Sequence, residues 1–275
     1  MLQDSETLWR VGVAIAVLAS MLLVERLWPR RPASGSFWRR ARTNLGLVVI
    51  DTLALRVLLP VAAAGVAMVA ERKGWGVLNV VPLPQWLAIV TAILALDLAI
   101  YAQHVAMHRL PILWRLHQVH HADRAFDVTT GVRFHPLEII VSMLYKCCCV
   151  GVIGAPVVAV VAFEILLNAA SLFNHGNVRL SGTLDARLRR VIVTPDMHRV
   201  HHAVYRDETD SNYGFFLSWW DRLFGTYVAE PRDGHTEMQI GLTQYADART
   251  GSLWWCLVLP FVGRRQAIKP NETKH

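Results

Sequence analysis

Apolar runs long enough to cross a lipid bilayer recur along this chain and leave few folds open to it. A helix needs about 20 residues to span a hydrocarbon core ~30 Å thick. Two runs meet this length and predict membrane spans, at residues 8–28 and 45–70. A third run, at 86–101, covers only 16 residues. We expect its helix to continue beyond the membrane surface and to count as the third span.

A fourth apolar run, at 137–173, is too long for one crossing and contains a break. Gly154, Ala155 and Pro156 interrupt it near the middle, and Gly and Pro are the residues that most often end helices. This pattern predicts two helices folded as a hairpin that enters and leaves the membrane by the same face. A later apolar segment, at 253–262, is too short to span and is expected to lie along the membrane interface.

The composition supports an integral membrane protein. Hydrophobic residues make up 53% of the 275 residues and charged residues only 18%, against ~25% charged in ordinary soluble domains. This balance excludes a disordered chain, a collagen-like fibre and a small disulfide-rich module. The predicted fold class is therefore all-α: a membrane helical bundle of three spans and a two-helix hairpin.

The formal net charge of +7 is concentrated in segments between the apolar runs. Arg residues crowd the first of these segments, at positions 30, 31, 39, 40 and 42. Cytoplasmic loops carry such an excess of positive charge, so we expect this loop on the cytoplasmic side and the N-terminus outside. This distribution does not favour binding to nucleic acid. The preference for Arg over Lys suggests a bacterial chain, and hence the inner membrane.

Ionisable residues within the predicted spans are candidates for function because they are costly in lipid. Asp51 and Arg56 lie in the second span. They are expected to face protein or water, unless the membrane begins after them. Asp97 lies in the third span and Glu164 in the second helix of the hairpin.

Histidines form three clusters with helical spacing. The clusters are His104 and His108; His117, His120 and His121; and His198, His201 and His202. Residues three or four apart share one face of a helix, so each cluster presents converging imidazoles. Eight imidazoles exceed the four to six ligands of one metal ion, which predicts two ions. Imidazole suits Zn, Cu, Fe and Ni, and the spacing alone does not choose among them.

Four further residues are candidates to support this site. His175 ends the hairpin and His135 begins it, so each is placed to complete a coordination sphere. His175 could instead be a helix-end residue and His135 an interfacial or supporting one. Asp97 and Glu164 lie in helical register with His104 and His175, and are predicted to accept hydrogen bonds from metal-bound imidazoles. A helix–helix contact unrelated to metal is the alternative for both acids.

The order of these motifs resembles the fatty acid hydroxylase/sterol desaturase superfamily, whose pattern is HxxxH, HxxHH and HxxHH. The resemblance extends over about residues 97–227 and includes Arg133-Phe134-His135-Pro136-Leu137-Glu138 after the second cluster. Many members have Arg directly after the first histidine, where this chain has Val105. The resemblance implies an N-terminal membrane region (1–85), a catalytic domain (86–230) and a C-terminal tail (231–275) with the interfacial segment.

This resemblance also implies a chemistry. Members are membrane-bound, non-haem di-iron oxygenases that use O2 and two external electrons to hydroxylate or desaturate a lipid. It assigns the eight clustered histidines to two iron ions, with His175 and His135 as further candidate ligands. Zinc is expected to replace iron in some purified samples. The sequence contains no cytochrome b5-like segment, so a ferredoxin, a cytochrome or a flavin reductase is expected to supply electrons.

Two other functions remain open at this point. One is a histidine-rich metal transporter, or a metal-binding protein without redox chemistry. Transporters usually place their ligands near the bilayer midplane, whereas these histidines flank the spans on one side, the predicted cytoplasmic face. The other is a haem carrier with two axial histidines, which a strong Soret absorbance band would reveal.

Overall fold

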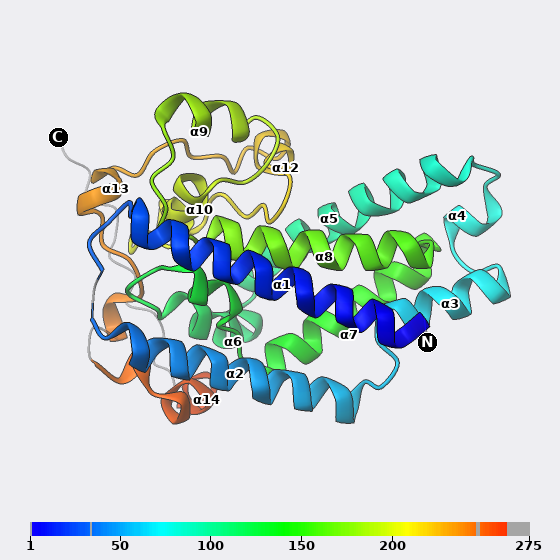
Figure 1. Cartoon of the computed structure of the whole chain (residues 1–275), viewed down its shortest axis with the longest axis horizontal. Coiled ribbons are helices and arrows are strands. Elements are labelled where there is room, and N and C mark those ends of the chain that lie inside the picture. The colour runs from blue at the N-terminus through cyan, green and yellow to red at the C-terminus, as the bar shows by residue number, and fades with distance from the viewer. Residues whose placement is uncertain (1, 34, 246–247, 263–275) are drawn as a thin grey trace.

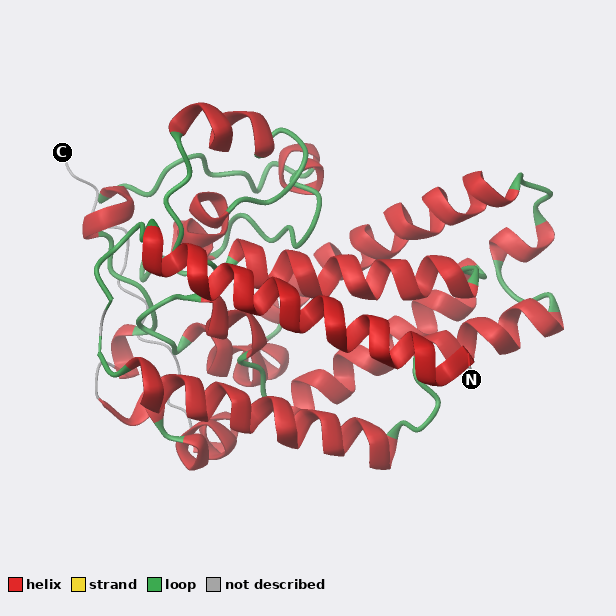
Figure 2. Ribbon diagram, in the orientation of Figure 1, coloured by secondary structure: helices red, strands yellow, loops and turns green. Residues whose placement is uncertain are grey.

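The computed structural model describes residues 2–33, 35–245 and 248–262. Within these ranges the chain is helical, with isolated β-bridges and no extended strand (Figure 2). This confirms the predicted all-α class. Four segments have the length and composition to cross a membrane: Phe37–Val80, Gln85–Arg109, Pro136–Ile153 and Val157–Asn174. Helix α1 (Leu2–Leu27) lies beside them but is not one of the four, so the number of spans stays a prediction.

Long helices run roughly along the long axis of the molecule (Figure 1). Their bounds are α1 (Leu2–Leu27), α2 (Phe37–Leu58), α5 (Gln85–Arg109), α7 (Pro136–Ile153) and α8 (Val157–Asn174). Helix α8 contacts both α1 and α5, whereas α7 contacts α2 and α5. Large apolar side chains such as Val57, Val152 and Val158 remain exposed on these helices, as expected for surfaces that face lipid.

The second predicted span is not one helix. Helix α2 ends at Leu58 and α3 (Ala63–Lys73) begins after Pro60, followed by the short α4 (Val77–Val80). Pro60 disfavours helical backbone at the residue before it, and Leu59 has left the helical region with φ −132° and ψ 65°. The predicted span over 45–70 therefore consists of two helices, α2 and α3, because a proline lies inside its apolar pattern.

The hairpin is confirmed, with a break where the sequence predicted it. Helix α7 stops at Ile153, Gly154 caps it in the left-handed region (φ +68°), and α8 starts after Pro156. The backbone of Gly76 packs directly on this turn. A Cβ on Gly76 would lie 2.2 Å from the backbone nitrogen of Gly154, so neither residue tolerates a side chain. This contact holds the α3–α4 connection against the hairpin.

Short helices and loops form a polar cap at the other end of the bundle (Figures 1 and 2). The cap comprises α6 (Pro111–His121), η1 (Val128–Val132), α9 (Gly182–Leu188), α10 (Pro195–His201), α11 (Arg206–Thr209), α12 (Trp219–Leu223), α13 (Gly234–Glu237), η2 (Thr243–Tyr245) and η3 (Ala248–Gly251). The Arg-rich segment before α2 reaches this cap, since Arg40 pairs with Asp123 and Asp127. Its position matches the predicted topology, in which the Arg-rich loop and the histidines share one side.

Helix α14 (Leu253–Val262) covers one flank of the cap and matches the predicted segment. Its Cys256 and Leu259 are buried against Leu47 of α2 and Val119 of α6. Trp254 and Phe261 are exposed. An apolar face that packs inward and large apolar side chains that point outward fit a helix lying at a membrane surface.

Candidate metal centre

Nine histidines gather in two groups whose candidate ligand atoms all lie within 4.8 Å of one another in each group. The first group contains His104 and His108 of α5, His117 and His121 of α6, and His201 of α10. The second contains His120 of α6, His198 of α10, and His175 and His202, which cap α8 and α10. All of them are buried except His108, which is half-buried.

Helical geometry explains how the clusters divide between the two groups. Residues four apart lie on one side of a helix, and the residue directly before or after one of them is rotated by about 100°. Accordingly His117 and His121 join the first group, while His120 joins the second. On α10 the relation is inverted, because His198 and His202 join the second group and His201 the first. Each three-histidine cluster therefore serves both groups.

Pairs of Nε2 atoms face each other at distances that suit a shared ion. The Nε2 atoms of His104 and His117 are 3.1 Å apart, as are those of His120 and His175. Two imidazole nitrogens each ~2.1 Å from one ion are separated by roughly 3.0–3.4 Å. The Nε2 atoms of His201 and His202 are buried without a hydrogen-bond partner in the described part of the chain. Both groups thus fit a metal ion.

In several of these histidines the opposite ring nitrogen, Nδ1, contacts a protein acceptor and leaves Nε2 for metal. The Nδ1 atoms of His104, His175 and His201 lie 2.7 Å from the carbonyl oxygens of Tyr213, Ser171 and Ser211. His120 Nδ1 lies 3.2 Å from the carbonyl of Arg133, and His108 Nδ1 lies 3.4 Å from Asp210 Oδ1. Donation of Nδ1–H to such acceptors fixes the tautomer that metal ligation requires.

Burial favours the neutral form, which is the form that binds metal, in several of these imidazoles. It lowers the pKa of His201 to about 3 and that of His175 to about 4. Burial, with repulsion from neighbouring imidazoles, also lowers the pKa values of His121 and His202 well below the usual range. Protonation therefore does not compete with metal binding near neutral pH.

Glu138 is the carboxylate in closest contact with a clustered histidine. Its Oε1 lies 2.7 Å from His117 Nδ1, and both side chains are buried. The sequence assigned this role to Asp97 and Glu164 instead. A clue was present, because Glu138 belongs to the Arg133–Glu138 motif that follows the second cluster. Its place in the first turn of α7 points it back toward α6.

Asp97 and Glu164 contact other groups than the predicted imidazoles. Asp97 Oδ2 accepts hydrogen bonds from the backbone N–H of Leu217 and from Trp220 Nε1. It thereby holds the loop that carries the carbonyl of Tyr213, and supports His104 only through that loop. Glu164 Oε1 accepts a hydrogen bond from Lys146 Nζ at 2.9 Å. His175 Nδ1 meets the carbonyl of Ser171, about one turn before it, whereas Glu164 lies about three turns before it.

His135 is not brought into either histidine group. Its Nδ1 accepts a hydrogen bond from the N–H of Leu137 and so caps the start of α7. Its Nε2 lies 3.1 Å from the carbonyl oxygen of Leu257 in α14. Both ring nitrogens therefore have partners at the start of α7, and the ligand role of His135 stays a prediction that these contacts do not support.

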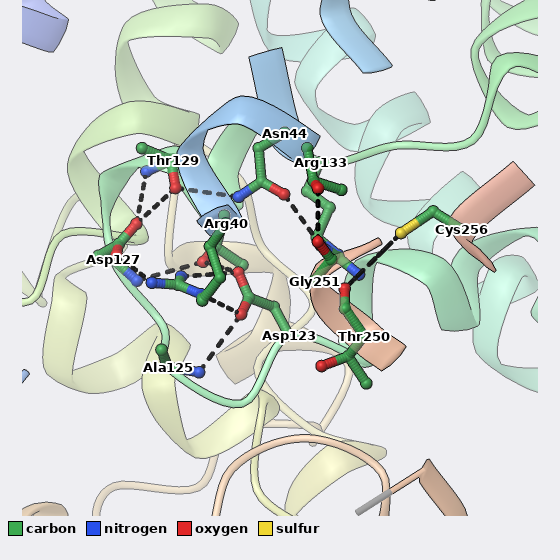
Figure 3. Close-up of polar contacts among 12 residues, drawn as sticks. Arg40, Asn44, Asp123, Ala125, Asp127, Thr129, Arg133, Thr250, Gly251 and Cys256 are labelled. Atoms are coloured by element: carbon green, nitrogen blue, oxygen red, sulfur yellow. Dashed lines mark hydrogen bonds and ion pairs between the residues drawn. The ribbon is translucent and has the colours of Figure 1, made fainter. Parts of the chain in front are cut away.

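A network of buried polar groups surrounds Arg133 (Figure 3), whose carbonyl faces His120. The Arg133 guanidinium donates to Asn44 Oδ1 and to the carbonyls of Val119 and Thr250. Arg40 binds Asp123 and Asp127 in the same region. The network ties α2 and the segment before α14 to the loop whose Arg133 carbonyl faces His120.

Replacing Glu138 with Gln is expected to weaken metal binding by the first group about tenfold. The amide still offers an oxygen to His117 but removes the negative charge, and loss of such a partner typically costs 10–100-fold in metal affinity. Competition with a chelator measures the affinity. Glu71→Gln is the control, since Glu71 contacts the N–H of Val157 in the hairpin. Unchanged affinity in Glu138→Gln would contradict this role.

A cavity of ≈480 Å³ adjoins the first histidine group. It lies between α2, α5, α7 and α8, and His104 and His117 line it. Its size falls within the ~300–1,000 Å³ of ordinary ligand sites. The cavity gives a molecule held among the apolar helices access to a metal at His104 and His117.

Comparison with known proteins agrees with this geometry. The chain is 28% identical over 252 residues to an ornithine lipid hydroxylase of Rhizobium tropici, covering 87% of this chain and 72% of that protein. It is 30% identical to the human alkylglycerol monooxygenase over 51% of this chain and 30% of that protein. It is 25% identical to a very-long-chain aldehyde decarbonylase of Oryza sativa over 50% of this chain and 23% of that protein. The chain thus spans only part of the length of these relatives.

No solved structure matches the chain significantly. The model of the fatty acid hydroxylase family matches residues 89–226. This range contains all nine histidines of the two groups and ends beside the loop that Asp97 holds. The chain therefore belongs to the fatty acid hydroxylase family.

Proposed function

We propose that this protein is an integral-membrane oxygenase that hydroxylates a C–H bond of a lipid at a site holding two iron ions. The observation that carries the proposal is the pair of buried groups of neutral imidazoles beside a cavity between membrane helices. Family membership and relatives named for lipid hydroxylation and monooxygenation support the same activity.

The reaction consumes one O2, two electrons and two protons for each C–H bond converted to C–OH, and releases one water. Desaturation of two neighbouring C–H bonds needs the same inputs and releases two waters. The iron ions, when bound, supply the O2 activation that no side chain offers. His104, His108, His117, His121 and His201 would hold one ion, and His120, His175, His198 and His202 the other.

The protein's own residues orient the imidazoles and exclude bulk water from the site. Glu138 and the carbonyls of Tyr213, Ser171 and Ser211 orient the imidazoles. The near-complete burial of the histidines keeps bulk water from the reacting carbon, which protects an oxidising site from side reactions.

The side of the membrane and the electron donor follow from charge and chemistry. The Arg-rich segment lies at the same end as the histidines, which supports a site on the cytoplasmic face by the positive-inside rule. A bacterial inner membrane fits the composition. A ferredoxin, cytochrome or flavin reductase on that side would deliver the two electrons.

A metal transporter, or a metal-binding protein without redox chemistry, is the second candidate. The two histidine groups favour this candidate, because they would bind metal ions even if the protein catalysed no reaction. The cavity beside His104 and His117 favours the oxygenase, since a transporter has no need of a lipid-sized space next to its ligands.

Purified without oxygen, the protein is expected to contain about two iron ions per chain and to show no strong Soret band. Cells that carry the gene are expected to contain an oxidised lipid that cells without it lack. Metal analysis and lipid mass spectrometry measure both results. Iron-loaded protein that oxidises no lipid when supplied with O2 and a reductant would contradict the oxygenase. Zinc in aerobically purified samples would not, because imidazole binds both metals.

A further inference from the structure

The cavity beside His104 and His117 is unusually acidic for a space between membrane helices. Three carboxylates line it, those of Asp51, Glu138 and Glu164, together with one lysine, Lys146. Ionisable groups at membrane depth are costly and mark substrate or ion sites when they face a cavity. The arrangement of these charges therefore bears on what the cavity binds.

Two of the three carboxylates already have a partner. Glu164 pairs with Lys146 at 2.9 Å. Glu138 Oε1 meets His117 Nδ1, although its Oε2 is buried without a hydrogen-bond partner in the described residues. The lysine thus pairs with one acid, and Asp51 has no cationic partner among the described residues.

Asp51 is held on the cavity face of α2 by its helical position. Val48, Thr52 and Leu55 line the cavity with it. Positions 48, 51, 52 and 55 have the three- and four-residue spacing of one helix face. The side chain is only 7% exposed. Its Oδ1 has no hydrogen-bond partner among the described residues. A buried carboxylate without a partner is strongly unfavourable, so a bound group that pairs with it gains affinity.

We propose that Asp51 binds an ammonium group of the lipid substrate, with Glu138 adding to the negative potential, so that the protein selects amine-bearing lipids. A carboxylate only accepts hydrogen bonds, which requires a donor on the substrate. Asp51 also lies within electrostatic range of Glu138. An ammonium group donates hydrogen bonds to the unpaired oxygens of Asp51 and Glu138, and its positive charge offsets the repulsion between the two acids. A hydroxyl group donates a hydrogen bond but does not offset the repulsion.

The rest of the cavity suits the remainder of such a lipid. Leu55, Ile100, Met143 and Leu167 supply apolar surface. Because His104 and His117 line the same cavity, the ammonium group and the oxidised carbon would occupy one cavity. This inference rests on the proposed function for the oxidation, but the binding itself can be measured without turnover.

The test compares hexadecylamine with N-hexadecylacetamide, which has the same chain and no charge at pH 7. Binding to the iron-loaded protein in detergent is followed by native mass spectrometry. The wild type is expected to prefer the amine at least about tenfold. Asp51→Asn, which keeps the shape and removes the charge, is expected to reduce this preference to threefold or less. Its metal content should remain about two ions per chain and its melting temperature should not fall.

Thr52→Val is the matched control. Thr52 lines the same cavity, and its hydroxyl donates within the helix to the carbonyl of Val48. This variant should keep the wild-type preference. A tenfold preference that survives in Asp51→Asn, or is absent from the wild type, overturns the proposal, as does an equal loss in Thr52→Val. If Asp51→Asn weakens hexadecanol binding as much as amine binding, Asp51 recognises a hydroxyl and the ammonium assignment is wrong.

Failure of this inference is distinguishable from failure of the oxygenase. Preference for the amine without any lipid oxidation would leave the binding site standing and remove the proposed function. Oxidation of neutral lipids by a protein that shows no preference for the amine would support the oxygenase and remove the proposed amine-binding site.

Discussion

The rate of lipid oxidation by the His201→Ala variant is expected to be more than about a hundredfold lower than that of the wild type. The variant is also expected to bind about one iron ion fewer per chain. His201 belongs to the first group and its Nδ1 is fixed by the carbonyl of Ser211. Loss of a group that only supports a ligand costs 10–100-fold in metal affinity or activity. Loss of the ligand itself should cost more. Anaerobic metal analysis and product formation from lipid measure the two effects.

His120→Ala tests the second group in the same way. His120 faces His175 at 3.1 Å between Nε2 atoms, so its loss opens a group of only four imidazoles. We expect about one iron per chain here as well, with the remaining ion in the first group. Activity should fall as far as in His201→Ala, because the proposed reaction needs both ions.

His135→Ala is the control for both variants. His135 contacts Leu137 and Leu257 and lies in neither group. This variant should keep about two iron ions, with a lower melting temperature from the lost cap of α7. Two iron ions and full activity in His120→Ala or His201→Ala would refute the assignment. Loss of iron in His135→Ala, at unchanged melting temperature, would show that His135 acts on the metal after all.

Replacing Arg133 with Met is expected to cause the largest loss of stability. Arg133 is fully buried, and its guanidinium donates to Asn44, Val119 and Thr250 (Figure 3). Methionine fills part of the space but leaves these acceptors unpaired and removes a charge that also faces Cys256. Breaking a buried charged network in this way typically costs about 3–5 kcal/mol, which corresponds to a fall in melting temperature of about 10 °C.

The same variant should weaken metal binding by the second group more than by the first. The carbonyl of Arg133 faces His120, whereas His117 rests on Glu138. Melting is followed in detergent on the iron-loaded protein, and metal release by chelator titration. Arg42→Met is the matched control, since Arg42 is exposed and bonds only within α2 to the carbonyl of Trp38. A melting temperature of Arg133→Met within about 2 °C of this control would contradict the assigned role.

Local residue spacing was sufficient to predict much of the fold. Apolar runs of the length of a bilayer predicted the long helices, and Gly154 with Pro156 predicted the hairpin turn, because helix formation and its interruption depend on neighbours along the chain. The exception is instructive. The apolar pattern of 45–70 continues across Pro60, but the backbone before a proline does not stay helical, so the run becomes α2 and α3.

The same spacing predicted that the clustered histidines form one dimetal site, but it could not divide them. Side chains three and four apart look equivalent on an isolated helix. Helical rotation separates His120 from His117 and His121, but which histidines of the other helices complete each group is decided only by how the helices pack together.

The partners of the histidines were likewise decided by tertiary packing. Asp97 and Glu164 share a helix face with histidines, yet Asp97 meets Trp220 and Glu164 meets Lys146. Glu138, from another helix, meets His117. Periodicity describes only which residues of one segment share a face. Which segment lies opposite that face depends on how helices distant in sequence bury their apolar surfaces together, and that contact selects Glu138 for His117 and leaves Asp51 facing the cavity.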